Sequence, residues 1–479
     1  KNWEEEGEMD TGTQEKIDGL IERIEEAART ELMVFRSGVV EASAEAAGRD
    51  EYYRTLSAIG AGILLLEDDR DTWLEVGKSP PFLHEQPLSR ETFDVMKQMT
   101  VEAFTDQDTK DEPIEVMMAM MAIHDLGKSK NFCNIVSEHL SQKELRNIAN
   151  HDQWLDHALQ HVDCSDREAP LSRLMPLLCS LDEVWQRRIK QAFSIELNVG
   201  QTLQGENSPK ELAAIVSTGQ DSQDPQAFQM FLVHFFLDTA GVMAKDLPEA
   251  TKRFNLGLMG EGLASAYVAL LEAIKELNGR EPGARGGSTP FALAAEAYRN
   301  YMVLRAARAG LDFRAVRGRS GDGAHFARLL CMLRAYHAGS PVRAAALLEA
   351  LNALPARARR VLDRELQLGG ERGLVIYYAP AFMCAAAGNA ALGAAMPARL
   401  GVALRLLAGL FAAARKHYEK EGGNNNYVVA TVTEEVGKVG APKEALAWRF
   451  AVTVDEHGKR SVERGTGGRS KECGSCQIS

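Results

Sequence analysis

Long apolar runs are absent from this chain of 479 residues. A helix that crosses a bilayer needs roughly 20 consecutive apolar residues, and no uninterrupted apolar stretch of that length occurs, so no transmembrane helix is expected. Cysteine is also scarce, since only seven residues are scattered along the chain. That scarcity excludes a disulfide framework and favours a reducing compartment, so a cytoplasmic location is expected.

Basic side chains are few in the first part of the chain, and the whole chain carries a formal net charge of -12. Residues 1–290 hold 28 Lys and Arg against 51 Asp and Glu, whereas residues 291–420 hold 19 against 8. An acidic surface repels nucleic-acid phosphates, so no nucleic-acid partner is expected. The basic charge of the second part is compatible with binding to an anion, to a membrane surface or to the acidic first part itself.

Apolar residues recur at helical spacing in a sequence that is 45% hydrophobic and 25% charged. These values are typical of a globular protein, and the spacing predicts an all-α fold with one large or two ordinary cores. Pro-rich residues 78–89 and amide-rich residues 198–209 are expected to be loops. The predicted helices begin after the N-cap candidate Thr13 and continue at residues 53–66, 90–104, 113–125, 135–149, 150–161, 174–193 and 227–244.

The composition changes at a linker rich in Gly, Pro and Arg, after which Ala and Arg dominate. Further on, three consecutive asparagines break the helical pattern, and β-branched residues then predict short strands and a hairpin. The predicted parts are a frayed N-terminus at 1–12, a helical domain at 13–280, the linker at 281–290, an Ala/Arg-rich helical domain at 291–421, a small β element at 422–464 with strands at 427–432, 449–454 and 459–463, and a flexible tail at 465–479.

The clearest chemical pattern is MMAMMAIHDLGKS, residues 117–129. Seven apolar residues lead to His124 and Asp125 at the expected end of a helix, and Gly127 and Lys128 end it. An imidazole and a carboxylate on adjacent residues can bind one metal ion or a metal ion and its water. Buried at the end of an apolar helix, these two side chains need partners.

The string His-Asp-Leu-Gly-Lys at 124–128 resembles the signature of the HD superfamily of all-helical metalloproteins, and the resemblance extends over residues 50–275. It implies an HD-domain-like helical bundle in which an upstream histidine, the His-Asp doublet and a distant aspartate bind metal. Asp238 matches the last position. It lies in an apolar helix, where its carboxylate needs either a metal or an arginine as partner. His84 is the only histidine before the doublet.

Members of this superfamily with two metals have further histidines between the doublet and the final aspartate. His151, 27 residues past His124, matches the first of these by spacing. The helix expected at 90–104 contains no histidine, and a second intermediate histidine is missing. The residues that would substitute for it are His157, His161 and Glu206.

Three functions are compatible with such a site. In a phosphohydrolase acting on a small phosphorylated or nucleotide substrate, one Mn, Mg, Zn or Fe ion activates water. Lys128 and His151 are the candidates for stabilising the anion or protonating the leaving group. An oxygenase with two irons acting on a small polar substrate, as in members similar to myo-inositol oxygenase, needs nearly a full set of ligands. The third function is that of a binding or scaffold protein with a degenerate site.

Two further segments suggest partners. The amide-rich residues 201–207 suit hydrogen bonding to a polar substrate, although such loops are more often only solvated. At the other end, Cys476 is followed by Gln-Ile-Ser, a farnesylation pattern. One lipid chain holds a protein only reversibly, so a weak association with a membrane is expected if Cys476 is prenylated. The pair Cys473 and Cys476 lacks the second pair that a zinc site needs.

Overall fold

The computed structural model describes most of the chain in separate stretches. The described residues are 11–36, 42–76, 87–148, 151–195, 197–206, 225–241, 260–278, 290–308, 341–366, 374–387, 396–421, 426–429, 450–455 and 459–464, together with residues 254, 256, 328, 329, 332, 433 and 448.

The chain divides into two compact units. Unit 1 contains Lys1–Glu196 and Gly219–Val268, and unit 2 contains Leu197–Thr218 and Ala269–Ser479. Residues 281–289 of the predicted linker lie outside the described residues. The division differs from the predicted domain at 13–280, because Leu197–Thr218 and the chain from Ala269 onwards are assigned to unit 2.

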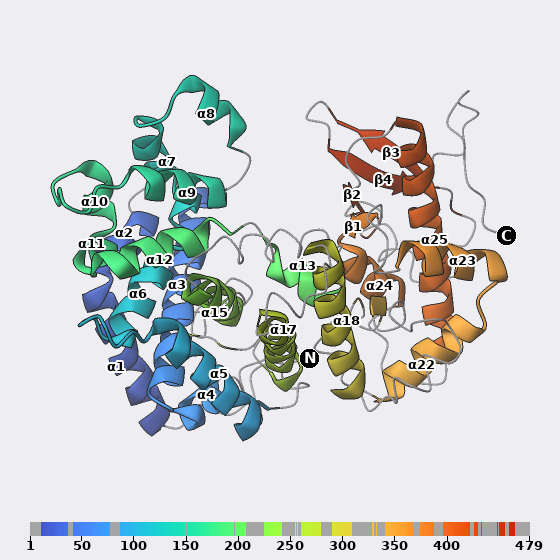
Figure 1. Cartoon of the computed structure of the whole chain (residues 1–479), viewed down its shortest axis with the longest axis horizontal. Helices are drawn as coiled ribbons and strands as arrows, with labels where there is room; N and C mark the ends of the chain where they lie inside the picture. Colours follow the sequence, from blue (N-terminus) through green and yellow to red (C-terminus); the bar gives the residue numbers. More distant parts are fainter. Residues whose placement is uncertain are drawn as a thin grey trace. The chain divides into compact units, whose positions relative to one another are not determined.

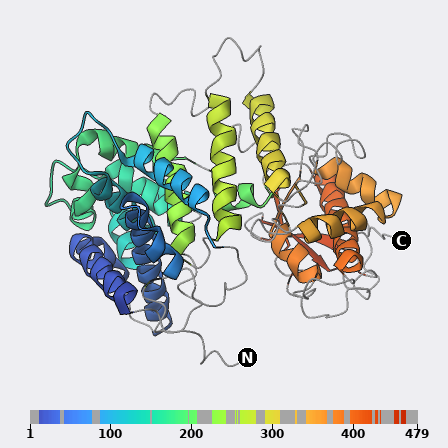
Figure 2. The same ribbon diagram turned by 90° about the horizontal axis from the view of Figure 1, so that it is seen from below.

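The described secondary-structure elements of unit 1 are all helices (Figures 1 and 2). Its helices are α1 (Thr11–Ala27), α2 (Arg29–Arg36), α3 (Ala42–Leu66), α4 (Arg70–Val76), α5 (Arg90–Phe104), α6 (Pro113–Ile123), the 3₁₀ turn η1 (Leu126–Lys128), α7 (Lys130–Ser137), α8 (Gln142–Asn147), α9 (His151–His161), α10 (Pro170–Leu174), α11 (Pro176–Ser180), α12 (Glu183–Phe193), α15 (Pro225–Gly241) and the first turns of α17 (Glu261–Asn278).

Helix α3 is central to unit 1, where it packs against α5, α6 and α15. Glycines permit this close approach. A Cβ atom on Gly62 would lie 2.5 Å from the sulfur of Met117, and one on Gly241 would lie 2.3 Å from the carbonyl oxygen of Arg54. Because no side chain fits at these two points, α3 comes close enough to α6 and α15 for their polar side chains to meet.

Capping residues in the sequence determine where helices α5 and α6 begin. The Ser89 hydroxyl accepts a hydrogen bond from the Thr92 N–H at 3.1 Å, which caps α5 as predicted. Pro113 occupies the first turn of α6, preceded by a capping box between Glu112 and Glu115. The helices predicted at 90–104 and 113–125 are therefore confirmed.

Two other predicted helices are broken in the structure. The helix expected at 135–149 is replaced by α7 and α8, because Ser141 caps a new helix through a capping box. The helix expected at 174–193 is replaced by α10, α11 and α12. Pro176 cannot donate a backbone hydrogen bond, so α10 ends before it and α11 begins with it.

Unit 2 combines helices with a sheet (Figure 1). Its described elements are α13 (Val199–Leu203), the remainder of α17, α18 (Pro290–Arg308), α22 (Pro341–Asn352), α23 (Ala356–Glu365), β1 (Val375–Tyr377), α24 (Ala379–Ala387), α25 (Met396–Glu421), β2 (Asn426–Val428), β3 (Phe450–Val454) and β4 (Arg460–Arg464).

The four strands form one sheet in the order β1-β2-β4-β3. Strands β1, β2 and β4 are parallel, whereas β3 and β4 are antiparallel, with Val452 opposite Val462. The strands predicted at 449–454 and 459–463 and their hairpin pairing are confirmed. Of the strand predicted at 427–432, β2 covers residues 427 and 428, and residues 430–432 lie outside the described residues. The sheet nevertheless extends beyond the predicted β element, because β1 lies within the Ala/Arg-rich region. Three residues are too short a stretch to show the alternation that predicts a strand.

Residues 198–206, predicted to be a loop, contain the short helix α13. The hydroxyls of Tyr298 and Tyr301 donate hydrogen bonds to the carbonyl oxygens of Thr202 and Leu203. Arg328, which is buried, donates to the carbonyl oxygens of the next turn. These donors satisfy the free carbonyl groups at the C-terminal end of α13, which explains why the segment belongs to unit 2.

Helix α25 is the one described helix that is long and apolar enough, by length and composition, to cross a membrane. Its most apolar window is 56% buried inside the protein. The helix packs against α22, α23 and α24, so it has the environment of a core helix.

Glu31 on α2 is completely buried in unit 1. One carboxyl oxygen accepts the Leu177 N–H at 2.8 Å, and the other has no partner among the described residues. Burial raises the pKa of Glu31 to about 7, although the hydrogen bond from Leu177 opposes the shift. Between pH 4.5 and about 7, the carboxyl group is therefore mostly protonated in the folded chain and mostly ionised in the unfolded chain.

We predict that Glu31→Gln removes part of the pH dependence of stability. The folded pKa lies above the unfolded value of 4.5, so the stabilisation is fully present below that value. It is lost as the pH rises towards 7, by on the order of 3 kcal/mol in the free energy of unfolding. Urea unfolding between pH 4 and 8 should give a flatter profile for the variant.

The exposed Glu22 on α1 provides the control. Glu22→Gln should keep the pH profile of the unmodified chain. Equal slopes for Glu31→Gln and the unmodified chain would contradict the assignment.

Candidate metal centre

Helix α6 places His124 and Asp125 in the interior of unit 1. Eight consecutive residues of this helix, from Val116 to Ile123, are buried, so the chain must end the helix inside the core. His124 is its C-cap residue, and both members of the doublet are only 4% exposed. The prediction that the doublet lies at the end of an apolar helix is confirmed.

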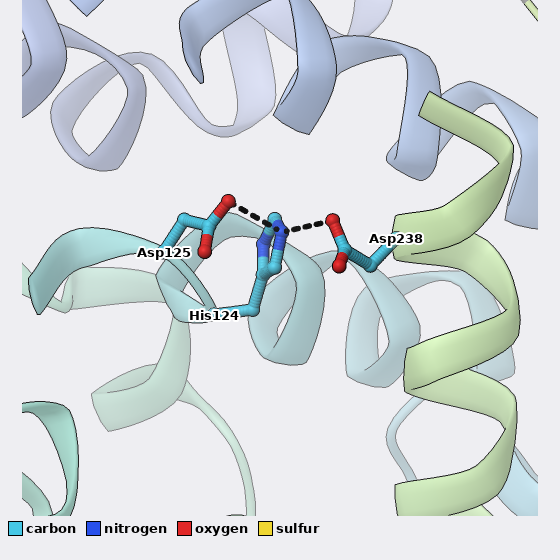
Figure 3. Close-up of side chains that lie close together, drawn as sticks. All are labelled: His124, Asp125 and Asp238. Atoms are coloured by element: carbon cyan, nitrogen blue, oxygen red, sulfur yellow. Dashed lines mark hydrogen bonds and ion pairs between the residues drawn. The ribbon is translucent and has the colours of Figure 1, made fainter. Parts of the chain in front are cut away.

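Asp238 on α15 reaches the same point from the opposite side (Figure 3). The Nε2 atom of His124 lies 3.2 Å from Oδ2 of Asp125 and 3.3 Å from Oδ1 of Asp238. One ligand atom from each of the three side chains lies within 4.8 Å of the others, so the cluster can hold a metal ion. The resemblance to HD proteins pointed to these three residues, and the structure brings them together.

The other ring nitrogen of His124 fixes the tautomer. Nδ1 lies 2.6 Å from the carbonyl oxygen of Met121, and a carbonyl oxygen can only accept a hydrogen bond, so Nδ1 carries a proton. Nε2 is then the atom that faces the two carboxylates. Metal-binding histidines generally donate their second N–H to a carboxylate or carbonyl group in this way.

The carboxylates of Asp125 and Asp238 favour a positive charge at Nε2 of His124. Burial alone would lower the pKa of His124, but the charge of Asp125 and hydrogen bonds to Asp125 and Asp238 outweigh it and raise the pKa to about 10. Burial would raise the pKa of Asp125, but His124, Lys128 and Arg54 hold it well below its usual range. The position beside Nε2 therefore attracts a cation.

Two basic side chains already accompany the carboxylates. Arg54 on α3 donates to Asp238 at 3.1 Å and to Glu51 at 3.0 Å. Lys128 donates to Asp125 at 2.7 Å and to Glu51 at 2.9 Å. Asp238 thus has an arginine partner, one of the two partners expected for it. Glu51, Asp125 and Asp238 thus share Arg54 and Lys128 as their cationic partners. Burial and the charge of Asp125 raise the pKa of Glu51.

His151, the first residue of α9, lies at the edge of the cluster. Its Nε2 is 3.9 Å from Asp125 and 3.2 Å from Asp152, and its side chain is 40% exposed. Gly127 permits this arrangement, since a Cβ atom there would lie 1.9 Å from the carbonyl oxygen of His151. The glycine of the motif therefore brings η1 against the start of α9.

Among the described residues, the group that could hold a metal ion does not include the predicted ligands His157, His161 and Glu206. His84 lies outside the described residues. His157 and His161 on α9 are close enough to Glu144 to lower its pKa, after the larger effect of Ser141. Glu206 belongs to unit 2, as do the described residues of the amide-rich segment. Cys476 also lies outside the described residues.

Sequence reasoning missed Glu51, Arg54 and His234. His234 is buried, and its ring centre lies 5.4 Å from that of His124. Burial and the charge of His124 lower the pKa of His234 to about 3, so the imidazole is neutral. Its position four residues before Asp238 on α15 was the available signal, because such residues share a helix face.

A protein-family profile described as "Family of unknown function (DUF6829)" matches residues 49–438. The match covers more than half of the chain, including His124, Asp125 and Asp238. No curated protein and no solved structure matches the chain.

We predict that Gly127→Ala destabilises unit 1. The added methyl group would meet backbone rather than a flexible side chain, so η1 and α9 must separate. Overpacking of this kind costs about 1–3 kcal/mol in the free energy of unfolding. Urea unfolding should therefore show a lower midpoint for the variant.

Gly19 in α1 is the matched control, because nothing lies within 4 Å of a Cβ atom there. Gly19→Ala should stabilise the helix by about 0.5–1 kcal/mol. Unchanged stability of Gly127→Ala would mean that the close approach of η1 and α9 is not essential.

Proposed function

The chain belongs to the DUF6829 family, whose function is unknown, and we propose a function from the site itself. We propose that the protein is a metal-dependent phosphohydrolase of the HD type that acts on a small phosphorylated or nucleotide substrate. The observation that carries the proposal is the orientation of His124. Its Nδ1–H is held by Met121, and its Nε2 faces carboxylate oxygens of Asp125 and Asp238 at 3.2 and 3.3 Å. One imidazole and two carboxylates suit a divalent ion such as Mn, Mg, Zn or Fe.

A divalent ion held by these three side chains would supply a Lewis acid for a phosphoryl oxygen and an activated water. The chain's own residues supply the remaining functions. Arg54 and Lys128 place two positive charges beside the carboxylates, at side-chain exposures of 13% and 21%. These positive charges would stabilise the charge that develops on a phosphoryl oxygen.

His151 fits the role of proton donor. Its ring reaches both the solvent and the edge of the cluster, where Nε2 lies 3.9 Å from Asp125. A general acid needs access to a proton source and to the leaving group at the same time. Lys128 is held by two carboxylates, which suits it to binding an anion rather than to transferring a proton.

One alternative is favoured by a specific observation. The ion pairs of Arg54 with Asp238 and of Lys128 with Asp125 compensate two carboxylates without a metal. A binding protein with a degenerate HD site would use the same pairs. An oxygenase with two irons needs more ligands than the three side chains grouped among the described residues.

We predict that Asp125→Ala lowers metal affinity by more than about 100-fold, since even outer-shell partners of metal ligands are worth about 10–100-fold. Phosphatase activity should be lost with the metal, while the apolar helices keep the fold. Metal content by mass spectrometry and far-ultraviolet circular dichroism would check both points. Asp94→Ala, at an exposed carboxylate on α5, is the control.

The purified chain should be assayed against nucleotides, sugar phosphates and polyols, with and without Fe(II) and oxygen. Hydrolysis of a phosphate ester with one metal per chain supports the proposal. Two irons and oxygen consumption would support the oxygenase, and the absence of any bound metal would support the degenerate site.

We predict that His151→Ala retains the metal but lowers kcat by about 10²–10⁴-fold with little change in KM, because general acid catalysis acts in the transition state. Steady-state kinetics and metal analysis on the same preparation would test this. His139→Ala is the control, at a histidine in the turn after α7. Loss of one metal equivalent would instead identify His151 as a ligand of a paired site.

A further inference from the structure

His234 is a buried imidazole without a partner. The residue is 7% exposed, and neither ring nitrogen has a hydrogen-bond partner among the described residues. Most buried polar groups are hydrogen-bonded, and an unpaired one costs stability. A phenylalanine at this place would avoid that cost, so the imidazole requires an explanation.

Two aromatic rings pack against the imidazole of His234. The rings of Phe193 and Phe235 lie with their centres 5.1 Å from that of His234, each at a steep angle. These aromatic rings hold the imidazole in place and keep water away from two of its sides. The oxygen Oδ1 of Asp238, the nearest acidic residue on α15, already interacts with Arg54 and His124.

Among the described ring contacts of His234, the polar ring is that of His124. Their centres are 5.4 Å apart, and the planes meet at 68°. Two imidazoles bound to one tetrahedral metal ion have ring centres roughly 5 Å apart, given bonds of about 2 Å from nitrogen to metal. His234 also precedes Asp238 by one helical turn, so both side chains leave α15 on the same face.

We propose that His234 is a further ligand of the metal centre, which then consists of two imidazoles and two carboxylates. The inference rests on the proposed function, because it needs a metal at His124, Asp125 and Asp238. A second imidazole changes which ion the centre prefers. Imidazole nitrogen suits Zn, Fe or Cu, whereas Mg favours oxygen ligands. The centre therefore selects a transition metal over Mg.

The test is titration of the full-length, metal-free chain with Co(II) and with Mg(II), followed by visible absorption and calorimetry. His234→Phe should weaken Co(II) binding by about 10–100-fold and change the Co(II) absorption spectrum, with little change in Mg(II) binding. His157→Phe is a matched control. His157 also has a buried ring nitrogen without a partner among the described residues, but it lies on α9.

The results separate this inference from the proposed function. If the unmodified chain binds no metal, both fail. If it binds Co(II) and His234→Phe binds it equally well with the same spectrum, only the role of His234 fails. His234→Gln, which keeps a polar side chain, replaces the first variant if circular dichroism shows that His234→Phe is unfolded. Pulsed electron spin resonance of the Cu(II)-loaded protein should then show one fewer coordinated imidazole in the variant, and an unchanged number would overturn the assignment.

Discussion

The burial of His124 and Asp125 at the end of an apolar helix is the constraint on which the rest of unit 1 depends. Helix α6 has no polar face, so its last residues cannot turn towards solvent. A carboxylate in that position must be paired or it destabilises the fold. Gly241 allows α15 to pack closely against the backbone of α3 at Arg54, which helps to bring Arg54 and Asp238 to the doublet. The close packing of the helices therefore also brings together the side chains that pair the buried charges of the site.

The sequence predicted those features that depend on neighbouring residues. Ser89 and Pro113 marked the starts of α5 and α6, and the helical predictions around them are confirmed. The break at Pro176 was visible in the sequence, but the apolar spacing on both sides of it masked the break. Strand β1 could not be predicted, because its pairing with β2 depends on residues far along the chain.

The site was predictable in part. His124, Asp125 and Asp238 followed from one motif and from the cost of burying a carboxylate. Glu51 and Arg54 could not be recognised, because an acid and a base three residues apart on a helix usually form an ordinary surface pair. Only the close packing of α3 against α15 brings this pair to Asp238. The role of His234 could not be recognised either, because a single histidine in an apolar helix gives no local sign of which residues surround it.

Several basic side chains of unit 2 pair with groups of the same unit. Arg415 pairs with the fully buried Glu365 through two of its nitrogens, and Arg328 donates to carbonyl groups after α13. Arg359 similarly donates to the last carbonyl groups of α22. All of these contacts lie within unit 2, so an anion, a membrane surface and the acidic first part of the chain stay predictions for the basic region.

The ion pairs of the metal centre determine how metal binding would relate to folding. In many small metal-binding domains the unpaired ligands repel one another, so the chain folds only with its metal. Here Arg54 and Lys128 neutralise most of the carboxylate charge beforehand, and large apolar helices surround the site. We therefore expect unit 1 to fold without the metal. Loss of a ligand would appear as lower metal affinity rather than as unfolding, so binding at this site can be measured separately from stability.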